Sequence, residues 1–331
     1  MNIHTISRRR RLVLKYAAVV GGAAVATPMF AQSAYPSRLI RMVVPVAPGF
    51  GTDTLARILA DELRKEFGLQ IVVENKAGGA GGSVGAEHVF RADPDGYTLL
   101  FTSQGPLGIN KLLYANLPYE PFKFAPIALV SESANVLLVR SDAKYKSLKE
   151  LIAAAKAEPG KMTYGSGGIG TTTHLSAELL KARTGTNILH VPFKGSAAAS
   201  TGLMSGQVDM FFGELGASLA HIKSGRLIAL GVGSENRQPQ LPDVPAIAEF
   251  IPGFKATVWF GLVAPPNTPP HIVGAASKLV VDVLSRKEVK SRLEGLGTRP
   301  IGTPSAEFRQ FIGDDFAYWE KVIREAAIAA Q

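Results

Sequence analysis

Hydrophobic and polar positions along the chain predict short strands followed by amphipathic helices. Residues 39–46 indicate a first strand, and the next helix keeps its apolar residues on one face until Gly68 ends it. Further strands are predicted at 71–73 and 97–101, with a helix over 83–91 between them. Strands that alternate with helices in this order are typical of an α/β fold with parallel strands.

A second series of the same kind follows residue 140. Ser147 and Glu150 form a capping-box signature that opens a helix, and Pro159-Gly160 ends it. Helices are also predicted to begin near 172 and 196, between strands at 162–164, 187–191, 210–212 and 227–232. Two long amphipathic segments complete the chain, over 270–296 and 305–329.

Two extended stretches are longer than one compact unit needs. Residues 126–140 are rich in Val, Leu and Ala, and 259–263 is extended again after a proline-rich region. We interpret them as segments that cross between two α/β lobes, near 134–140 and 254–264, with a cleft between the lobes. The predicted organisation is an export signal over 1–34, a first lobe over 35–136, a second lobe over 137–255, and a return to the first lobe over 256–331.

The positive charge of the chain is concentrated at its N-terminus. Arg8 to Arg11 and Lys15 carry five charges in a segment of 34 residues without Asp or Glu. An apolar run over 17–26 and small residues near 31–34 complete the pattern of a cleaved export signal. An uncleaved anchor is the alternative, although the run is shorter than the roughly 20 residues that span a bilayer. The Arg10-Arg11 pair also fits a twin-arginine signal, so the Sec and twin-arginine routes both stay open.

Composition and the remaining charge narrow the classes of protein. The 331 residues are 46% hydrophobic, which is too apolar for a disordered chain. Without the five N-terminal charges the formal net charge falls from +9 to +4, so nucleic-acid binding loses its main support. The absence of cysteine removes disulfides, thiolate nucleophiles and every cysteine-containing zinc site. No histidine pair has metal-binding spacing, and we expect no metal site.

The loops that follow the predicted strands are rich in small residues. They run into predicted helix starts, and they cover 48–53, 77–83, 102–105, 165–172 and 193–196. Ligands of open parallel sheets bind beyond the carboxyl ends of the strands. Helix N-termini there attract anions by about 0.3–1 kcal/mol each. Any single loop could be only a tight turn, but such loops in both lobes favour an anion-binding site.

Two enzyme motifs occur in these loops, and neither has its expected context. Residues 165–170 match G-x-G-x-x-G, but the acidic residue of a dinucleotide site is missing from 187–194, so we expect no cofactor. Residues 81–85 match G-x-S-x-G, but a polar loop replaces the strand that should lead into the nucleophile. Ser83 is predicted to be a helix N-cap instead.

Seven segments, in order along the chain, carry a resemblance to a known family. They are PVAPG (45–49) with Asp53, ENK (74–76), PDGYTL (94–99), YGSGGIG (164–170), HVPFKG (190–195), GQVD (206–209) and LPDVP (241–245). Together they resemble the Bug family, the exported solute-binding proteins of tripartite tricarboxylate transport systems. The resemblance implies a type II periplasmic binding protein fold, a Venus flytrap of two lobes that closes on a small carboxylate. It also implies a periplasmic protein without catalytic activity that serves membrane permease subunits, and we expect a monomer.

The resemblance also implies where the ligand binds. The family's ligand loops fall on Gly49, Phe50, Gly51, Thr52, Asp53, Gly79, Ala80, Ser103, Ser166, Gly167, Gly170, Thr171, Thr172 and Lys194. Asp53 is either a ligand-binding group or a first-turn anion that stabilises its loop. Lys194 either offers its charge to the ligand or is a solvated lysine at a strand end. Phe50 stands where the family usually has a second glycine, and it either packs on its own lobe or projects into the cleft, which we favour.

Two other functions share these sequence features. A periplasmic hydrolase could use Ser83 or Ser166 as its nucleophile, and activity on esters that a Ser→Ala change abolishes would support it. A sensor that signals to a membrane receptor would need the same clamp as a transport protein. Sequence does not separate the sensor from the transport protein.

Overall fold

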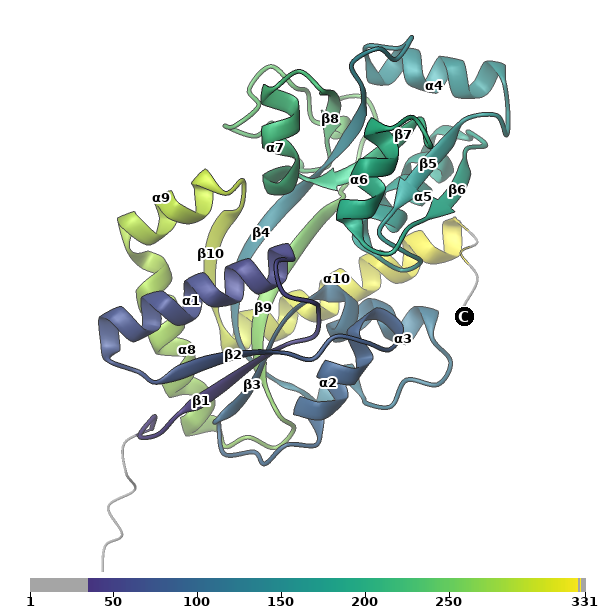
Figure 1. Ribbon diagram of the computed structural model, residues 1–331. Helices are drawn as coiled ribbons and strands as arrows, with labels where there is room; N and C mark the ends of the chain where they lie inside the picture. Colours follow the sequence, from purple (N-terminus) through teal and green to yellow (C-terminus); the bar gives the residue numbers. More distant parts are fainter. Residues whose placement is uncertain (1–34, 327, 329–331) are drawn as a thin grey trace, which may run out of the picture. The chain divides into compact units, whose positions relative to one another are not determined.

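The computed structural model describes residues 35–326 and 328, so the predicted export signal over 1–34 lies outside the described residues. The chain forms an α/β fold in which one sheet belongs to each of two lobes (Figure 1). The first sheet has the order β2-β1-β3-β9-β4, and β10 also pairs with β4. Its strands are β1 (Ile40–Val44), β2 (Ile71–Asn75), β3 (Thr98–Ser103), β4 (Ala125–Arg140), β9 (Thr257–Ala264) and β10 (Arg299–Pro304).

The second sheet has the order β4-β7-β5-β6, and β8 also pairs with β4. Its further strands are β5 (Thr163–Ser166), β6 (Leu189–Pro192), β7 (Met210–Glu214) and β8 (Leu227–Val232). The predicted parallel pairing is confirmed for β1 with its two neighbours and for β5 with its two neighbours. Strands β4, β9 and β10 pair antiparallel, because they run between or alongside the lobes instead of following a βα unit.

Helices cover the sheets and bury their apolar faces. In α1, Gly68 adopts a left-handed conformation (φ 67°) and its N–H donates to the Arg64 carbonyl, so the helix ends where the sequence predicts. The helices of the first lobe are α1 (Gly51–Phe67), α2 (Ser83–Phe90), α3 (Asn110–Leu113), α8 (Pro270–Ser285) and α9 (Lys287–Gly295). Those of the second lobe are α4 (Leu148–Ala157), α5 (Thr172–Thr184), α6 (Ser196–Met204) and α7 (Leu215–Lys223).

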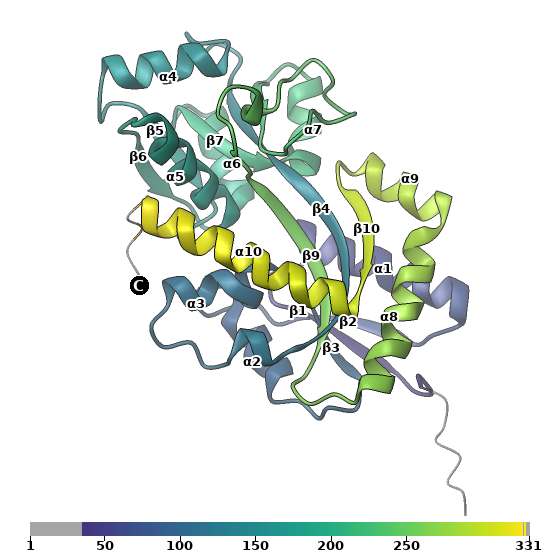
Figure 2. The same ribbon diagram turned by 180° about the vertical axis from the view of Figure 1, so that it is seen from behind.

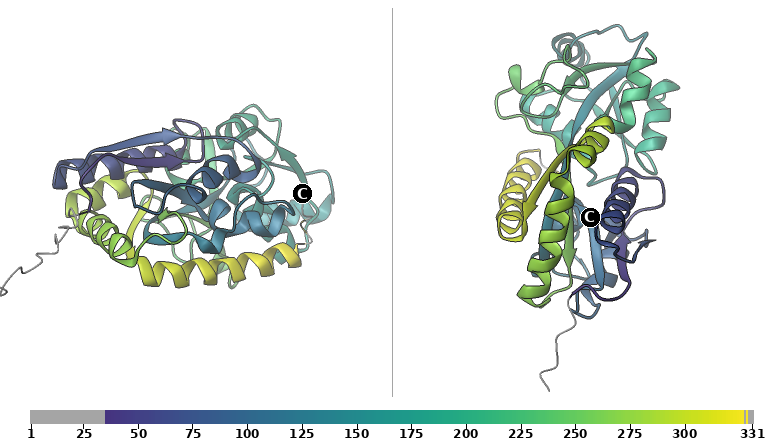
Figure 3. Two further views of the ribbon diagram at one scale, coloured as in Figure 1. Left: turned by 90° about the horizontal axis from the view of Figure 1, so that it is seen from below. Right: turned by 90° about the vertical axis from the view of Figure 1, so that its left-hand side faces the viewer.

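Helix α10 (Ser305–Glu325) contributes to the cores of both lobes. Its buried Phe308 and Ile312 pack with residues of β3 and β9. Its buried Trp319 and Val322 pack with residues of α5 and β7. Figures 2 and 3 show the helix, in yellow, running past both sheets. The two lobes are therefore tied together by a helix as well as by strands.

Strand β4 is the main connection between the lobes. Its residues 125–134 pair with β9, and its residues 135–140 pair with β7 and β8. At the transition, the Asn135 N–H donates to the Ala256 carbonyl (3.0 Å), and the Gly233 N–H donates to the Asn135 carbonyl (2.7 Å). Crossing strands therefore occur in the regions that the sequence predicts, while the residue boundaries of the lobes stay a prediction.

Candidate functional site

A cleft of about 840 Å³ is lined by loops of both lobes. From the first lobe come the loops after β1, β2 and β3, and from the second come those after β5, β6 and β7. These loops follow carboxyl ends of strands, which is where the sequence analysis places the site. Residues with side chains or backbone in the cleft include Val46, Phe50, Thr52, Gly79, Ser103, Asn110, Gly167, Thr171, Thr172, Lys194, Glu214, Val258 and Phe260.

Asp53 stabilises the first loop and is itself only 3% exposed. Its carboxylate accepts hydrogen bonds from the Gly49 N–H (2.9 Å) and from Asn75 Nδ2 (2.8 Å), and it pairs with the Arg57 guanidinium (2.9 Å). Burial by itself raises the pKa of Asp53, but Arg57, Gly49 and Asn75 hold it below its ordinary value. The described contacts of Asp53 are thus those of a group that holds the loop after β1 in place.

Phe50 reaches across the cleft to the second lobe. It directly precedes α1, and 38% of its surface is exposed. Its ring atoms lie 3.1 and 3.3 Å from the position that a Cβ atom on Gly195 would occupy. Gly195 has φ 99° and ψ 158°, a conformation that side-chain-bearing residues rarely adopt. The ring therefore lines the cleft and faces the loop after β6.

The second glycine-rich loop brings its backbone close to α2 and α3. Gly78, Gly79, Gly81 and Gly82 all have positive φ. Gly82 takes the N-cap position, and Ser83 is the first residue of α2, so the prediction of Ser83 as the N-cap was wrong by one residue. The cause is that the left-handed Gly82 already ends the loop (φ 82°). Ser83 is 7% exposed and does not line the cleft.

Asn110 is a polar residue of the cleft that sequence reasoning missed. It is 2% exposed, and its Nδ2 donates to the Gly81 carbonyl (3.0 Å) and to the Tyr119 hydroxyl (3.3 Å). A Cβ atom on Gly81 would lie 2.3 Å from Asn110 Oδ1. Glycine at 81 therefore lets the loop after β2 lie directly against α3.

The loop after β5 uses many of its own polar groups. The Gly167 N–H donates to Thr173 Oγ1 (2.9 Å), and the Gly170 N–H donates to His174 Nδ1 (3.3 Å). Thr171 caps α5 by accepting from the His174 N–H (3.4 Å). The amides of Gly167 and Gly170 are thus occupied, and Thr172 begins a helix whose first N–H groups have no intrahelical partner. We expect the first N–H groups of α5 to be the hydrogen-bond donors that this loop offers to a ligand.

Ser166 lies beneath that loop and has no exposed surface. Its hydroxyl lies 2.6 Å from His190 Nε2 and accepts from the Gly168 N–H (3.1 Å). The ring of His190 stacks on Tyr164 (4.7 Å between centroids) and lies 4.4 Å from the ring of His174. This cluster contacts the loop after β5, which lines the cleft, through the amides of Gly168 and Gly170.

The two histidines of the cluster are neutral in the folded protein near neutral pH. Burial lowers the pKa of His174 to about 4. Burial also lowers the pKa of His190, against the opposing charge of Glu178. Glu178 accepts a hydrogen bond from the Tyr164 hydroxyl and pairs with Lys181 (2.7 Å). The charges of the cluster are therefore balanced without protonated imidazoles.

The sequence-predicted site residues do not all line the cleft. Those that line the cleft are Phe50, Thr52, Gly79, Ser103, Gly167, Gly170, Thr171, Thr172 and Lys194. Gly49 and Gly51 line a neighbouring cavity of about 240 Å³, while Asp53 and Ser166 are buried. Ala80 lies in the short helical turn Ala80–Gly82. Sequence reasoning missed Glu214, Asn110, Val258 and Phe260, because no local motif marks them.

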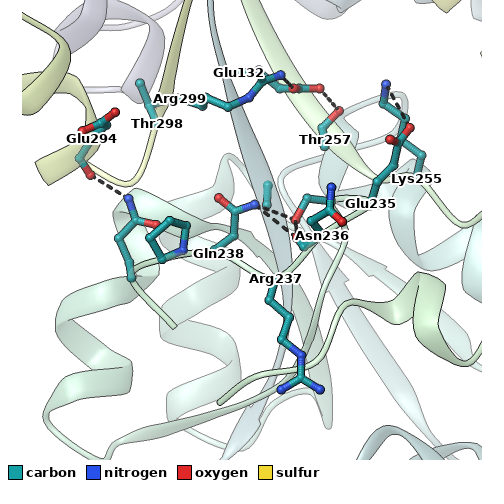
Figure 4. Close-up of a pocket in the computed structure, with 14 residues that line it drawn as sticks. Glu132, Glu235, Asn236, Arg237, Gln238, Lys255, Thr257, Glu294, Thr298 and Arg299 are labelled. Carbon is teal, nitrogen blue, oxygen red and sulfur yellow. Dashed lines mark hydrogen bonds and ion pairs between the residues drawn. The ribbon is translucent and has the colours of Figure 1, made fainter. Parts of the chain in front are cut away.

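A second groove, of about 590 Å³, contains Glu132, Thr257 and Arg299 (Figure 4), and alternation along β9 puts it on the face of that strand away from the cleft. Thr257 faces this groove, while the next residue, Val258, faces the cleft, as alternation along a strand requires. Glu132 in the groove accepts from the Thr257 hydroxyl (2.8 Å) and pairs with Arg299 (2.6 Å). The polar groups that line the groove are thus partly satisfied by hydrogen bonds and ion pairs with one another.

Two further properties concern the described residues. Within 35–326 and at 328, no three acidic, histidine or cysteine side chains gather in a way that could hold a metal ion. No helix in the same part of the chain is long and apolar enough to span a membrane.

The fold and its interlobe cleft define a solute-binding protein of the periplasmic binding protein type. The family model described as "Tripartite tricarboxylate transporter family receptor" (TctC) matches residues 55–328, and the chain belongs to this family. It is 36% identical to Protein BugT of Bordetella pertussis over 318 residues, which cover 95% of this chain and 97% of BugT. These findings confirm the family resemblance and the fold class predicted from the sequence.

Solved structures agree with this assignment. The structure of R. palustris Rpa4515 with adipate has a TM-score of 0.84 and 33% identity, covering 90% of this chain and 100% of that one. Periplasmic binding protein BugD gives a TM-score of 0.80 and 34% identity over 90% and 100% of the two chains. MatC from Rhodopseudomonas palustris with bound malate gives 0.78 and 33% over 87% and 100%.

Proposed function

We propose that this protein captures a small organic carboxylate in the interlobe cleft and delivers it to a membrane permease of the tripartite tricarboxylate type. The observation that carries the proposal is that loops of both lobes, with the starts of α1 and α5 among them, line one cleft. Helix starts favour anions. Thr52, Ser103 and Thr172 add hydroxyl groups, and the exposed Lys194 adds a positive charge. The similar proteins that hold adipate and malate support the same ligand class.

The apolar part of the cleft indicates what else the ligand carries. Val46, Ile109, Val258 and Phe260 line it, and Phe50 closes one side. Burial of carbon against such surfaces contributes about 25 cal/mol per Å². We therefore expect a carboxylate with an aliphatic or aromatic body instead of a densely charged one.

The proposal includes export and a membrane partner. The N-terminal segment has the pattern of a cleaved signal, and the similar BugD is a periplasmic binding protein. We propose that the mature chain is a periplasmic monomer that receives its ligand there and docks on permease subunits. The signal leaves the Sec and twin-arginine routes open.

A thermal-shift screen of mono-, di- and tricarboxylates, amino acids and aromatic acids tests the proposal. A ligand that binds only the folded state stabilises it by about 4 kcal/mol at a thousandfold excess over its Kd, so a hit is easily seen. Thr172→Val should weaken the hit, and Thr201→Val, a threonine of α6 outside the cleft, is the control. If only sugars or cations shift the transition, the carboxylate function is wrong.

A further inference from the structure

Glu214 is the acidic side chain of the cleft. It is the last residue of β7 and precedes α7, in the second lobe. Among the described residues that line the cleft there is no other Asp or Glu. An acidic side chain is unexpected where loops and helix starts favour anions, so its surroundings decide what it contributes.

The carboxylate of Glu214 points across to the first lobe. Its Oε2 atom lies 2.9 Å from the position that a Cβ atom on Gly51 would occupy, at the first residue of α1. Glycine at 51 leaves the space that this carboxylate fills. Glu214 also lines the neighbouring cavity that Gly49 and Gly51 line. The carboxylate thus stands at the meeting point of the two lobes.

The start of α1 lies beside this carboxylate and favours its charge, but no side chain of the described residues pairs with it. The backbone carbonyl of Glu214 accepts from the Ser218 hydroxyl (2.8 Å), but no hydrogen bond or ion pair reaches the carboxylate from residues 35–326 or 328. Burial raises the pKa of Glu214. Lys194 lines the same cleft without forming an ion pair with it in this part of the chain. The carboxylate therefore keeps acceptor capacity for a donor that enters the cleft.

We propose that Glu214 is a specificity-determining residue of the cleft, which accepts a hydrogen bond from a donor group, an ammonium or a hydroxyl, that the ligand carries beside its carboxylate. This inference rests on the proposed carboxylate function of the cleft. The ligand carboxylate then lies at the start of α5 and near Lys194, and the donor group lies at Glu214, whose carboxylate stands at the start of α1. A ligand in this position also lies beside the first lobe, whose loops after β2 and β3 line the same cleft.

Ligands that share a carbon skeleton test this inference. Calorimetry should compare succinate with malate and aspartate, and 3-phenylpropionate with phenyllactate and phenylalanine. In at least one series, the hydroxy or amino acid should bind the wild type about tenfold or more tightly than the plain acid, as expected for a hydrogen bond to a charged group. Preference for the hydroxy or for the amino acid identifies the donor.

Two variants assign that preference to Glu214. Glu214→Gln should reduce the preference, and Glu214→Ala should remove it. Glu235→Gln, which neutralises an exposed acid in the groove on the other face of β9, should leave it unchanged. Melting temperatures without ligand show that the variants fold.

Two results would overturn the inference in different ways. If the plain acid binds the wild type best and gains affinity in Glu214→Gln, Glu214 only repels the ligand, and the carboxylate function stands. If none of the acids binds, the proposed function fails, and the role of Glu214 fails with it.

Discussion

The ring of Phe50, in the first lobe, lies against the backbone of Gly195, in the second, at 3.1 Å from where a Cβ atom would stand. Both residues line the cleft. A ring in this position contacts the second lobe and also faces the cleft in which we propose that the ligand binds. Changes at Phe50 and at Gly195 therefore test different features, namely the contact of the ring with a ligand and the backbone conformation against which the ring packs.

Phe50→Gly should weaken binding of an acid with an apolar body. Loss of an aromatic contact costs about 0.5–1.5 kcal/mol beyond area terms, or about two- to tenfold in Kd. Calorimetry on the best hit measures the change, and Phe250→Ala, an exposed phenylalanine outside the cleft, is the control. Equal affinities of wild type and Phe50→Gly would show that the ring does not contact the ligand.

Gly195→Ala should destabilise the folded protein. The backbone at φ 99° and ψ 158° is nearly restricted to glycine, and the added Cβ would crowd Phe50, so we expect a loss of about 1–3 kcal/mol. Urea unfolding measures it. Gly274→Ala, in α8 with open space around it, should be neutral or stabilising. A Gly195→Ala protein as stable as the wild type would contradict the described backbone.

Asp53→Asn should loosen the loop after β1. Loss of hydrogen bonds to a charged, buried group costs about 1.5–3 kcal/mol. The pKa of Asp53 is lowered in the folded state, so its contribution is present above the ordinary carboxyl pKa and disappears as pH falls through the folded value. Urea unfolding at pH 7 and pH 3 should therefore show a smaller difference between the two proteins in acid.

Asp61→Asn is the matched control for that prediction. Asp61 pairs with Arg64 on the same helix, but both side chains are exposed, and such pairs contribute about 0–1 kcal/mol. If Asp61→Asn costs as much stability as Asp53→Asn, the network at Asp53 has no special role.

His174 should make the free energy of unfolding depend on pH, in the range between the pKa of this histidine in the unfolded chain and its pKa in the folded protein. Its folded pKa, lowered to about 4, lies below the ordinary value near 6.5, so the unfolded chain binds the proton first. Stability is complete above about pH 6.5 and falls towards pH 4, by up to about 1.4 kcal/mol per pH unit. His174→Gln should flatten this part of the curve, whereas the exposed His271→Gln should not. An unchanged curve for His174→Gln would rule out this origin.

Ligand binding should bring the lobes together. Each lobe supplies only some of the donors, so a ligand that contacts both favours a closed arrangement. Small-angle scattering of the purified protein with the best hit should give a smaller radius of gyration than without it. A radius that stays constant at saturation would indicate a site confined to one lobe.

The elements of the fold were predictable where the pattern was local and strong. β10 was not predicted, because Pro300, Gly302 and Pro304 disfavour a strand and only pairing with the edge of β4 stabilises it. The single amphipathic segment predicted over 270–296 is two helices, since Arg286 is extended (ψ 136°). The apolar residues keep a helical spacing across this break, so the sequence does not reveal it.

The loops of the candidate site were predictable from the sequence, but the residues that line it from within strands were not. Thr52, Thr172 and Lys194 lie in the loops or helix starts that follow strands, so the carboxyl-end rule finds them. Glu214 ends β7, so the same rule applies to it, whereas Phe260 lies within β9 and enters the cleft only because β9 pairs with strands far apart in the sequence. No local signal distinguishes Phe260 from other strand residues.

The order of the strands along the chain has a consequence for folding during synthesis. The second sheet draws its strands from residues 125–232, whereas the first sheet needs β9 and β10, which leave the ribosome last. Contacts between distant segments form slowly, and domains tend to fold in the order of synthesis. The second sheet can therefore pair before the first, which still lacks β9, although α10 completes the cores of both lobes last. Until β9 is added, the edge of β3 that β9 covers in the folded protein has unpaired backbone groups.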